Sequence, residues 1–341
     1  MFKPVAIVLF AVALSNLASA ANVSDLTACG NAQQQKKFDE GIQSCTRALN
    51  ARGVNASDQA FAYQRRGRIF FAQRKYDEAI ADFSEVIRLK PGFAENYADR
   101  GNAYAAKGEG DKALADLDEA VRLDPVNIRV RVLRGNIRTN AGRFDLALVD
   151  FDAVIRAEPR FGDAFIGRAR VHARMARSEQ AMADLDTAVQ ISPESSTYRT
   201  ARGIARMQTG QYSAAVEDFD VLIRNNPDEP LHYNNRCYTL ALADRAREAL
   251  PDCDKALSIR PDAAGARDSR GLVYLRLGQY QAAIEDYNAA LRIAPRLAPA
   301  LYGRGIARLG LGDVAGNEDV VEAVKIDPAI AARMAGVGVT P

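Results

Sequence analysis

The chain has 341 residues with 45 basic and 43 acidic side chains, so its formal net charge is only +2. Charges of both signs are interleaved and no basic block occurs, which argues against binding to nucleic acid or anionic lipid. Tryptophan is absent and there are only two histidines, which limits the metal chemistry available.

Residues 1–20 have the features of a secretory signal peptide. Lys3 supplies a positive charge, residues 5–14 form an apolar run, and residues 18–20 form a cleavage site of small side chains. The run is too short to cross a bilayer as a helix, and no other stretch is long and apolar enough to do so. We therefore expect a secreted protein of the bacterial periplasm whose mature chain begins at Ala21. The alternative is a retained membrane anchor.

A fixed period governs most of the remaining chain. Eight prolines recur at one constant interval, which shortens only before the last of them: Pro91, Pro125, Pro159, Pro193, Pro227, Pro261, Pro295 and Pro328. The interval is about 34 residues, a period typical of stacked helix–turn–helix units. Small residues recur in the same register, as at Gly67 and Ala79. Because glycine inside a helix costs about 1 kcal/mol relative to alanine, this recurrence indicates that two antiparallel helices approach closely.

The pattern resembles the tetratricopeptide repeat. With proline at position 32 of the unit, that family has a small residue at 8, aromatic residues at 17 and 24, and alanine at 20. Two units that match well are Gly67, Tyr76, Ala79, Phe83 and Pro91, and Gly203, Tyr212, Ala215, Phe219 and Pro227. The resemblance implies an all-α, right-handed superhelical solenoid of about nine helix–turn–helix repeats, whose first helices line a concave groove.

The repeat register divides the mature chain into three parts. Residues 21–59 contain a degenerate first repeat and a connector, and residues 60–328 contain eight tandem repeats. Residues 329–341 are expected to form a short capping helix over 329–335 and then a frayed tail, because the last repeat of an array needs its open face covered.

Position 7 is arginine and position 23 is aspartate in all eight good repeats. The pairs are Arg66–Asp82, Arg100–Asp116, Arg134–Asp150, Arg168–Asp184, Arg202–Asp218, Arg236–Asp252, Arg270–Asp286 and Arg304–Asp319. We interpret each as an ion pair that joins the two helices of one repeat. A single exposed pair is worth roughly 0 to 1 kcal/mol, but its repetition would set the register. The competing hypothesis is a row of ligand-binding arginines.

The four cysteines form two pairs with identical spacing, Cys29 with Cys45 and Cys237 with Cys253. Both pairs occupy positions 8 and 24, on opposite helices of one hairpin. Behind a signal peptide this predicts two disulfides within hairpins. Free buried thiols are one alternative, and lipidation of Cys29, which follows a sequence similar to a lipoprotein box, is another. No metal site is expected, because cysteines so far apart in the array cannot converge on one ion.

In the tetratricopeptide family, positions 2, 5, 9, 12 and 13 of the first helix face the groove. Carried over to this chain, they predict two walls. One is polar and mildly basic and consists of Asn102, Arg129, Asn136, Asn140, Arg170 and Arg174. The other is apolar and consists of Ile204, Met207, Leu231, Tyr238, Leu272, Leu275, Tyr302, Ile306 and Leu309. The alternative for the apolar set is packing against neighbouring first helices.

No catalytic motif appears, and His172 and His232 fall at packing or surface positions of the repeat. The sequence therefore predicts a non-enzymatic scaffold of the cell envelope, without cofactor or metal, that holds a protein, an extended peptide or a helix in its groove. Two other classes remain open. One is an accessory protein for polysaccharide export or cell-wall assembly, and the other is a hydrolase or transferase with an unrecognised site.

Overall fold

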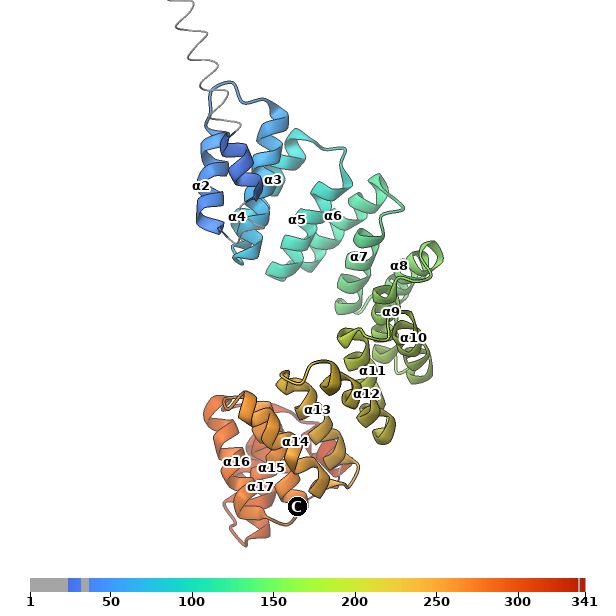
Figure 1. The fold of residues 1–341 in the computed structure, drawn as a ribbon, viewed down its shortest axis with the longest axis vertical. Helices are drawn as coiled ribbons and strands as arrows, with labels where there is room; N and C mark the ends of the chain where they lie inside the picture. Colours follow the sequence, from blue (N-terminus) through green and yellow to red (C-terminus); the bar gives the residue numbers. More distant parts are fainter. Residues whose placement is uncertain (1–23, 32–36, 337, 341) are drawn as a thin grey trace, which may run out of the picture. The chain divides into compact units, whose positions relative to one another are not determined.

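The computed structural model describes residues 24–31, 37–336 and 338–340, and every regular element within them is an α-helix (Figure 1). The expected signal peptide, its cleavage site and Ala21 lie outside these residues. The chain divides into two compact units, Met1–Met175 and Ala176–Pro341. No described helix has the length and apolar composition needed to cross a membrane.

The N-terminal unit is a stack of helical hairpins. After a helical stretch at residues 24–31, its helices are α2 (Phe38–Leu49), α3 (Ala56–Ala72), α4 (Tyr76–Leu89), α5 (Ala94–Lys107), α6 (Gly110–Leu123), α7 (Ile128–Asn140), α8 (Phe144–Ala157) and α9 (Gly162–Arg174). Helices α3 and α4, α5 and α6, and α7 and α8 pack together as the two helices of successive repeats.

The C-terminal unit has the same organisation. Its helices are α10 (Ser178–Ile191), α11 (Ser196–Gln208), α12 (Tyr212–Asn225), α13 (Pro230–Leu242), α14 (Ala246–Ile259), α15 (Ala264–Arg276), α16 (Tyr280–Ile293), α17 (Ala298–Gly310), α18 (Gly316–Ile326) and α19 (Ile330–Gly336). The hairpins of helices α11 to α18 follow one another in chain order. The stacked-repeat fold expected from the regular proline spacing is thus confirmed in each unit.

Glycine at position 8 allows the two helices of a repeat to touch. A Cβ atom added to Gly135 in α7 would lie 2.9 Å from the Phe151 ring in α8, closer than real Cβ contacts allow. The same relation holds between Gly271 and Tyr287, at 2.8 Å. The recurring glycine therefore has a steric cause, the large side chain at position 24.

The turn inside each repeat needs a left-handed residue at position 15. Gly142 adopts this conformation with φ of 73°. Three repeats place a residue other than glycine at the same position, and Arg74, Ala176 and Asp244 also have positive φ, between 56° and 61°. The hairpin geometry is thus kept even where the sequence does not favour it.

Most successive first helices within a unit contact one another, as α5 does α7 and α13 does α15, although α11 and α13 do not to that extent. Successive second helices of the described residues within either unit make no contact of that extent. The first helices of each unit therefore lie closer together than its second helices and form its inner face.

The end of the chain differs from the expected frayed tail. Val339 N–H donates to the Met334 carbonyl (2.9 Å) and Gly338 N–H to the Ala335 carbonyl (3.0 Å), while Gly338 has φ of 74°. These two bonds around a left-handed glycine form a Schellman motif, which ends α19. Val339 is buried, so this residue after α19 packs against the protein, whereas Gly338 and Thr340 are exposed.

Candidate functional site

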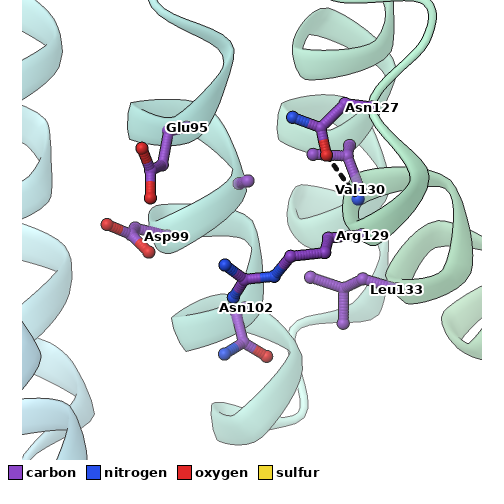
Figure 2. Close-up of a pocket in the computed structure, with 8 residues that line it drawn as sticks. Glu95, Asp99, Asn102, Asn127, Arg129, Val130 and Leu133 are labelled. Atoms are coloured by element: carbon purple, nitrogen blue, oxygen red, sulfur yellow. Dashed lines mark hydrogen bonds between the residues drawn. The ribbon is translucent and has the colours of Figure 1, made fainter.

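The inner face of the N-terminal unit contains a pocket of about 390 Å³ between α5 and α7. Its lining consists of Glu95, Ala98, Asp99, Asn102, Asn127, Arg129, Val130 and Leu133. Two predicted groove residues, Asn102 and Arg129, are brought together here. In Figure 2 the Arg129 side chain extends from α7 toward Asn102 on α5.

The two walls of this pocket differ in charge. On α5, Glu95 and Asp99 both accept hydrogen bonds from Arg68 of α3, at 2.9 and 3.0 Å. Burial raises the pKa of Asp99, and the neighbouring Arg68 opposes the rise. On α7, Arg129 is exposed and forms no ion pair with any residue of the described chain. The pocket therefore offers one available cation opposite carboxylates that already have a partner.

The α7 end of the pocket is held by a local cap. Asn127 accepts a hydrogen bond from Val130 N–H at 3.2 Å through its side-chain oxygen, which starts the helix (Figure 2). This cap satisfies one of the free N–H groups at the start of α7. Arg129 is the second residue of the same helix, so its backbone position is set by the capped turn.

The other predicted polar residues lie further along the inner face. Arg170 of α9 donates a hydrogen bond to the Asn136 side chain of α7. Arg174 lies over the Phe144 ring, with 5.7 Å from guanidinium carbon to ring centroid. Asn140 is exposed. Asn136 and Arg170 thus form a bridge between neighbouring first helices, and they do not line the pocket that contains Asn102 and Arg129.

Four of the nine residues of the predicted apolar wall are buried. Leu272, Leu275, Tyr302 and Ile306 are buried and belong to one large apolar cluster that also contains Ile330, Met334 and Val339 from the end of the chain. The expectation that these four residues face an empty groove is therefore wrong. They pack against neighbouring helices and the C-terminal segment.

The remaining apolar residues have mixed surroundings. Ile204 and Met207 are half-buried against the core of their own hairpin, and Tyr238 and Leu309 are also half-buried. Leu231 is 50% exposed and lines a smaller pocket of about 190 Å³ between α13 and α15. In that pocket the side-chain oxygen of Asn234 is buried without a hydrogen-bond partner among the described residues.

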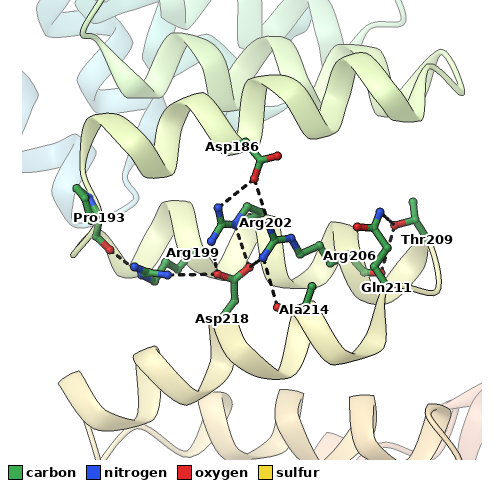
Figure 3. Close-up of polar contacts among 9 residues, drawn as sticks. All are labelled: Asp186, Pro193, Arg199, Arg202, Arg206, Thr209, Gln211, Ala214 and Asp218. Atoms are coloured by element: carbon green, nitrogen blue, oxygen red, sulfur yellow. Dashed lines mark hydrogen bonds and ion pairs between the residues drawn. The ribbon is translucent and has the colours of Figure 1, made fainter.

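The repeated arginines at position 7 are structural. In Figure 3, Arg202 of α11 donates through Nε and Nη2 to Asp218 of α12, at 3.0 and 2.5 Å. Its Nη1 donates to Asp186 of the preceding repeat at 3.0 Å. Seven predicted pairs are confirmed: Arg66–Asp82, Arg100–Asp116, Arg134–Asp150, Arg202–Asp218, Arg236–Asp252, Arg270–Asp286 and Arg304–Asp319. Arg168–Asp184, whose residues belong to different units, stays a prediction.

Sequence reasoning missed the link to the preceding repeat. Every position-7 arginine donates to the residue at position 25 of the previous unit, as Arg100 does to Ser84 at 3.1 Å and Arg236 to Asp220 at 2.6 Å. A recurrence signal was present: Asp118, Asp152, Asp186, Asp220 and Asp254 follow the same period. Because these guanidinium groups already bind carboxylates within the fold, they are not a row of ligand-binding arginines.

Both predicted cysteine pairs lie at disulfide separation. The Cα atoms of Cys29 and Cys45 are 4.9 Å apart, and those of Cys237 and Cys253 are 5.4 Å apart. None of the four cysteines is left as a separate thiol. The sulfur of Cys29, which lipidation would require, is directed at Cys45.

The described residues contain no group of three or more His, Cys, Asp or Glu side chains placed to hold a metal ion. His172 and His232 lie on different helices, α9 and α13. His232 is buried, and burial lowers its pKa.

Comparisons with known proteins agree with this geometry. Residues 67–108 and 271–312 match the family described as TPR repeat, and residues 132–196, 200–266 and 94–127 match families described as tetratricopeptide repeat. No curated protein matches the chain.

Several solved structures are similar. A tetratricopeptide repeat protein from Parabacteroides merdae is 17% identical with a TM-score of 0.57, over 78% of this chain and 99% of that one. The APC/C hetero-tetramer Cut9–Hcn1 is 18% identical with a TM-score of 0.56, over 85% and 57%. PilF of Pseudomonas aeruginosa is 13% identical with a TM-score of 0.52, over 62% and 97%. At these identities the likeness concerns the fold.

Proposed function

Because this chain belongs to the tetratricopeptide-repeat family, whose arrays are scaffolds that bind proteins or peptides, we propose that it is a non-enzymatic scaffold that holds a peptide segment against its first helices. The observation that carries the proposal is the pocket between α5 and α7, where Asn102 and the available cation of Arg129 lie together.

The chemistry of this pocket suits an extended peptide. A carboxamide such as that of Asn102 carries both donors and an acceptor, so it can bond to the N–H and the C=O of a peptide backbone. Arg129 can bind a carboxylate through two parallel hydrogen bonds. Val130 and Leu133 add apolar side chains to the lining of the same pocket. We therefore propose that the segment bound here carries an acidic side chain or a terminal carboxylate.

We further propose that this binding takes place in the cell envelope. The support is the signal-like sequence of residues 1–20 and the two cysteine pairs at disulfide separation, since disulfides persist in oxidising compartments such as the periplasm. Expression of the full chain with a reporter that is active only outside the cytoplasm tests this step, and cytoplasmic retention would reject it.

Binding to a peptide array tests the proposed site. Peptides selected by the unmodified chain should bind the Asn102→Ala/Arg129→Ala variant at least about tenfold more weakly, equivalent to about 1.4 kcal/mol. The matched control is Glu119→Ala/Arg122→Ala, which removes an exposed ion pair from α6, a second helix. Equal affinity for the pocket variant and the control would reject the site. If no peptide binds at all, the proposed function itself fails.

A further inference from the structure

The C-terminal segment, whose described residues are 330–336 and 338–339, lies along first helices of the C-terminal unit. Helix α19 contacts α17. Beyond it, a Cβ atom added to Gly338 would lie 3.3 Å from Nη1 of Arg276, which is in α15. Arg333 of α19 also acts on Tyr238 of α13: burial raises the pKa of Tyr238, and the charge of Arg333 opposes the rise. The segment therefore reaches from α17 to α15, and its positive charge acts on a residue of α13.

This placement goes further than that of a helix that only extends the stack. In a repeat array each unit contacts mainly its neighbours, so an added helix would contact the last hairpin, α17 and α18, as α19 itself does. The approach of Gly338 to Arg276 of α15 lies beyond that hairpin, so the chain after α19 turns back over the inner face. In Figure 1 the red end of the chain is drawn beside the orange helices of this unit.

The segment packs into the same apolar cluster as side chains that the repeat register directs to the inner face. Ile330, Met334 and Val339 are 1%, 7% and 3% exposed. They share one apolar cluster with Leu272, Leu275, Tyr302 and Ile306. These four residues stand at positions 5, 9 and 12 of their repeats, where the family pattern places ligand-facing side chains. The buried side chains of the segment and these four inner-face residues thus belong to one continuous apolar core.

The segment itself has the form of a short bound helix. Ile330 and Met334 are one helical turn apart and lie on the same face. The Schellman motif at Gly338 ends the helix and turns Val339 back toward the cluster. Arg333 forms its ion pair with Asp327, which precedes α19 in the chain. That pair stabilises the turn before α19 and does not tie the segment to the first helices.

We propose that the first-helix face of α13, α15 and α17 is a binding surface for a short amphipathic helix, and that residues 330–339 occupy it as a tethered, displaceable ligand. The partner it fits has two aliphatic or thioether side chains one turn apart and a third after a glycine-capped end, a helix-in-groove mode of recognition. This surface belongs to the C-terminal unit alone. The proposal is therefore independent of the pocket between α5 and α7.

Displacement can be measured with a labelled peptide of residues 328–341. A tethered segment has an effective concentration on the order of millimolar, so it should weaken binding of a peptide with a Kd of about 10 µM by about 100-fold. The peptide should bind weakly to the unmodified chain and about 100-fold more tightly to full-length Met334→Glu, whose own segment can no longer bury that position. A chain ending at Pro328 should bind as Met334→Glu does.

Ala332→Glu is the matched control, because Ala332 is an exposed residue of the same helix. It should behave like the unmodified chain, and a Met334→Glu peptide should bind no form of the protein. The proposal is overturned if the peptide of residues 328–341 binds neither Met334→Glu nor the chain ending at Pro328, which are the two opened chains. It is also overturned if the peptide binds these two proteins, the unmodified chain and Ala332→Glu equally well. Loss of helical content in both opened chains overturns it too, since the segment would then be an integral part of the core.

Hydrogen exchange on the unmodified chain gives a second measurement. The amides of Gly338 and Val339 should exchange by an opening that leaves α17 protected, because a displaceable segment detaches before the array unfolds. Exchange of these amides only together with α17 would contradict the proposal. A concentration-dependent dimer that the chain ending at Pro328 cannot form would also contradict it, because the segment would then bind a second copy.

Discussion

The backbone of Gly303 in α17 lies directly against the Tyr287 ring of α16: a Cβ atom on Gly303 would be 2.8 Å from Cε1 of Tyr287 and closer still to Cζ and Oη. Tyr287 is among the largest fully buried side chains. This contact joins two successive repeats, because α16 is the second helix of one and α17 the first helix of the next.

Gly303→Ala should therefore destabilise the protein by about 1 to 3 kcal/mol, the usual cost of overpacking a core. Gly265→Ala is the control, since a Cβ at Gly265 in α15 meets no atom within 4 Å, and alanine is the better helix former. Urea unfolding followed by circular dichroism measures both. Equal stability of the two variants would show that the Tyr287 ring can move aside.

The carboxylate of Asp150 is fully buried and forms ion pairs with Arg134 and Arg138. Nη1 of Arg131 lies 3.6 Å from Oδ1 of the same carboxylate. Asp150→Asn should cost about 3 to 5 kcal/mol, because removing one partner leaves buried positive charges unpaired. Asp111→Asn breaks an exposed pair with Arg143 and should cost about 0 to 1 kcal/mol. Thermal unfolding of the two variants side by side measures the difference. A loss for Asp150→Asn no larger than for Asp111→Asn would contradict this assignment.

The cysteine pairs should be oxidised in protein isolated from an oxidising compartment. Intact mass after alkylation without reductant should then show no modified thiol. Each bridge closes a short loop within one hairpin, and a loop of this size corresponds to about 3 kcal/mol in the chain-entropy account. The free energy of unfolding of Cys253→Ala, measured in urea, should be lower by about that amount. Reduction of the same disulfide in the unmodified chain should have the same effect. Four alkylated cysteines without reductant would reject the disulfides.

Asp268 should make the C-terminal unit less stable as the pH rises. Burial raises the pKa of Asp268 to about 7, whereas an unfolded aspartate has a pKa of about 3.9. The unfolded chain therefore releases this proton first, so the free energy of unfolding falls between about pH 4 and pH 7. The neighbouring Tyr238 and Tyr287 titrate above this range, because burial raises the pKa of both.

The measurement is the unfolding midpoint at pH 5 and at pH 8 for the unmodified chain and for Asp268→Asn. The unmodified chain should lose more stability over this interval than the variant does, since asparagine does not titrate. Parallel pH profiles would show that Asp268 ionises normally in the folded protein. His232 is unchanged in both proteins, so its titration cancels in the comparison.

The repeat itself could be read from the sequence because its determinants are local. Gly135 and Phe151, or Arg134 and Asp150, are close in sequence and sit on the two helices of one hairpin. Each recurs at a fixed period, so one physical explanation accounts for all repeats. The left-handed turn between the two helices of a repeat was harder to predict from the sequence. Arg74 has positive φ at a position where other repeats have glycine, and an arginine side chain does not indicate this conformation.

The candidate site was predicted only in part. Asn102 and Arg129 meet in one pocket as the register implied. Glu95 stands at position 2, a groove position, so the repeat register could have indicated it as well. Asp99 is at position 6, outside the family's groove positions, and it enters the pocket because Arg68 binds it from the preceding repeat.

The amino-acid sequence by itself determined the helical hairpins, their close glycine contacts, and the ion pairs and cysteine pairs within repeats, since these depend on residues a few turns apart. Only the tertiary structure decided which inner-face side chains are open. Leu272 and Tyr302 are buried in a cluster that also contains Ile330, Met334 and Val339, which lie outside the periodic pattern. Periodicity specifies which way a side chain points, whereas exposure depends on everything that packs in front of it.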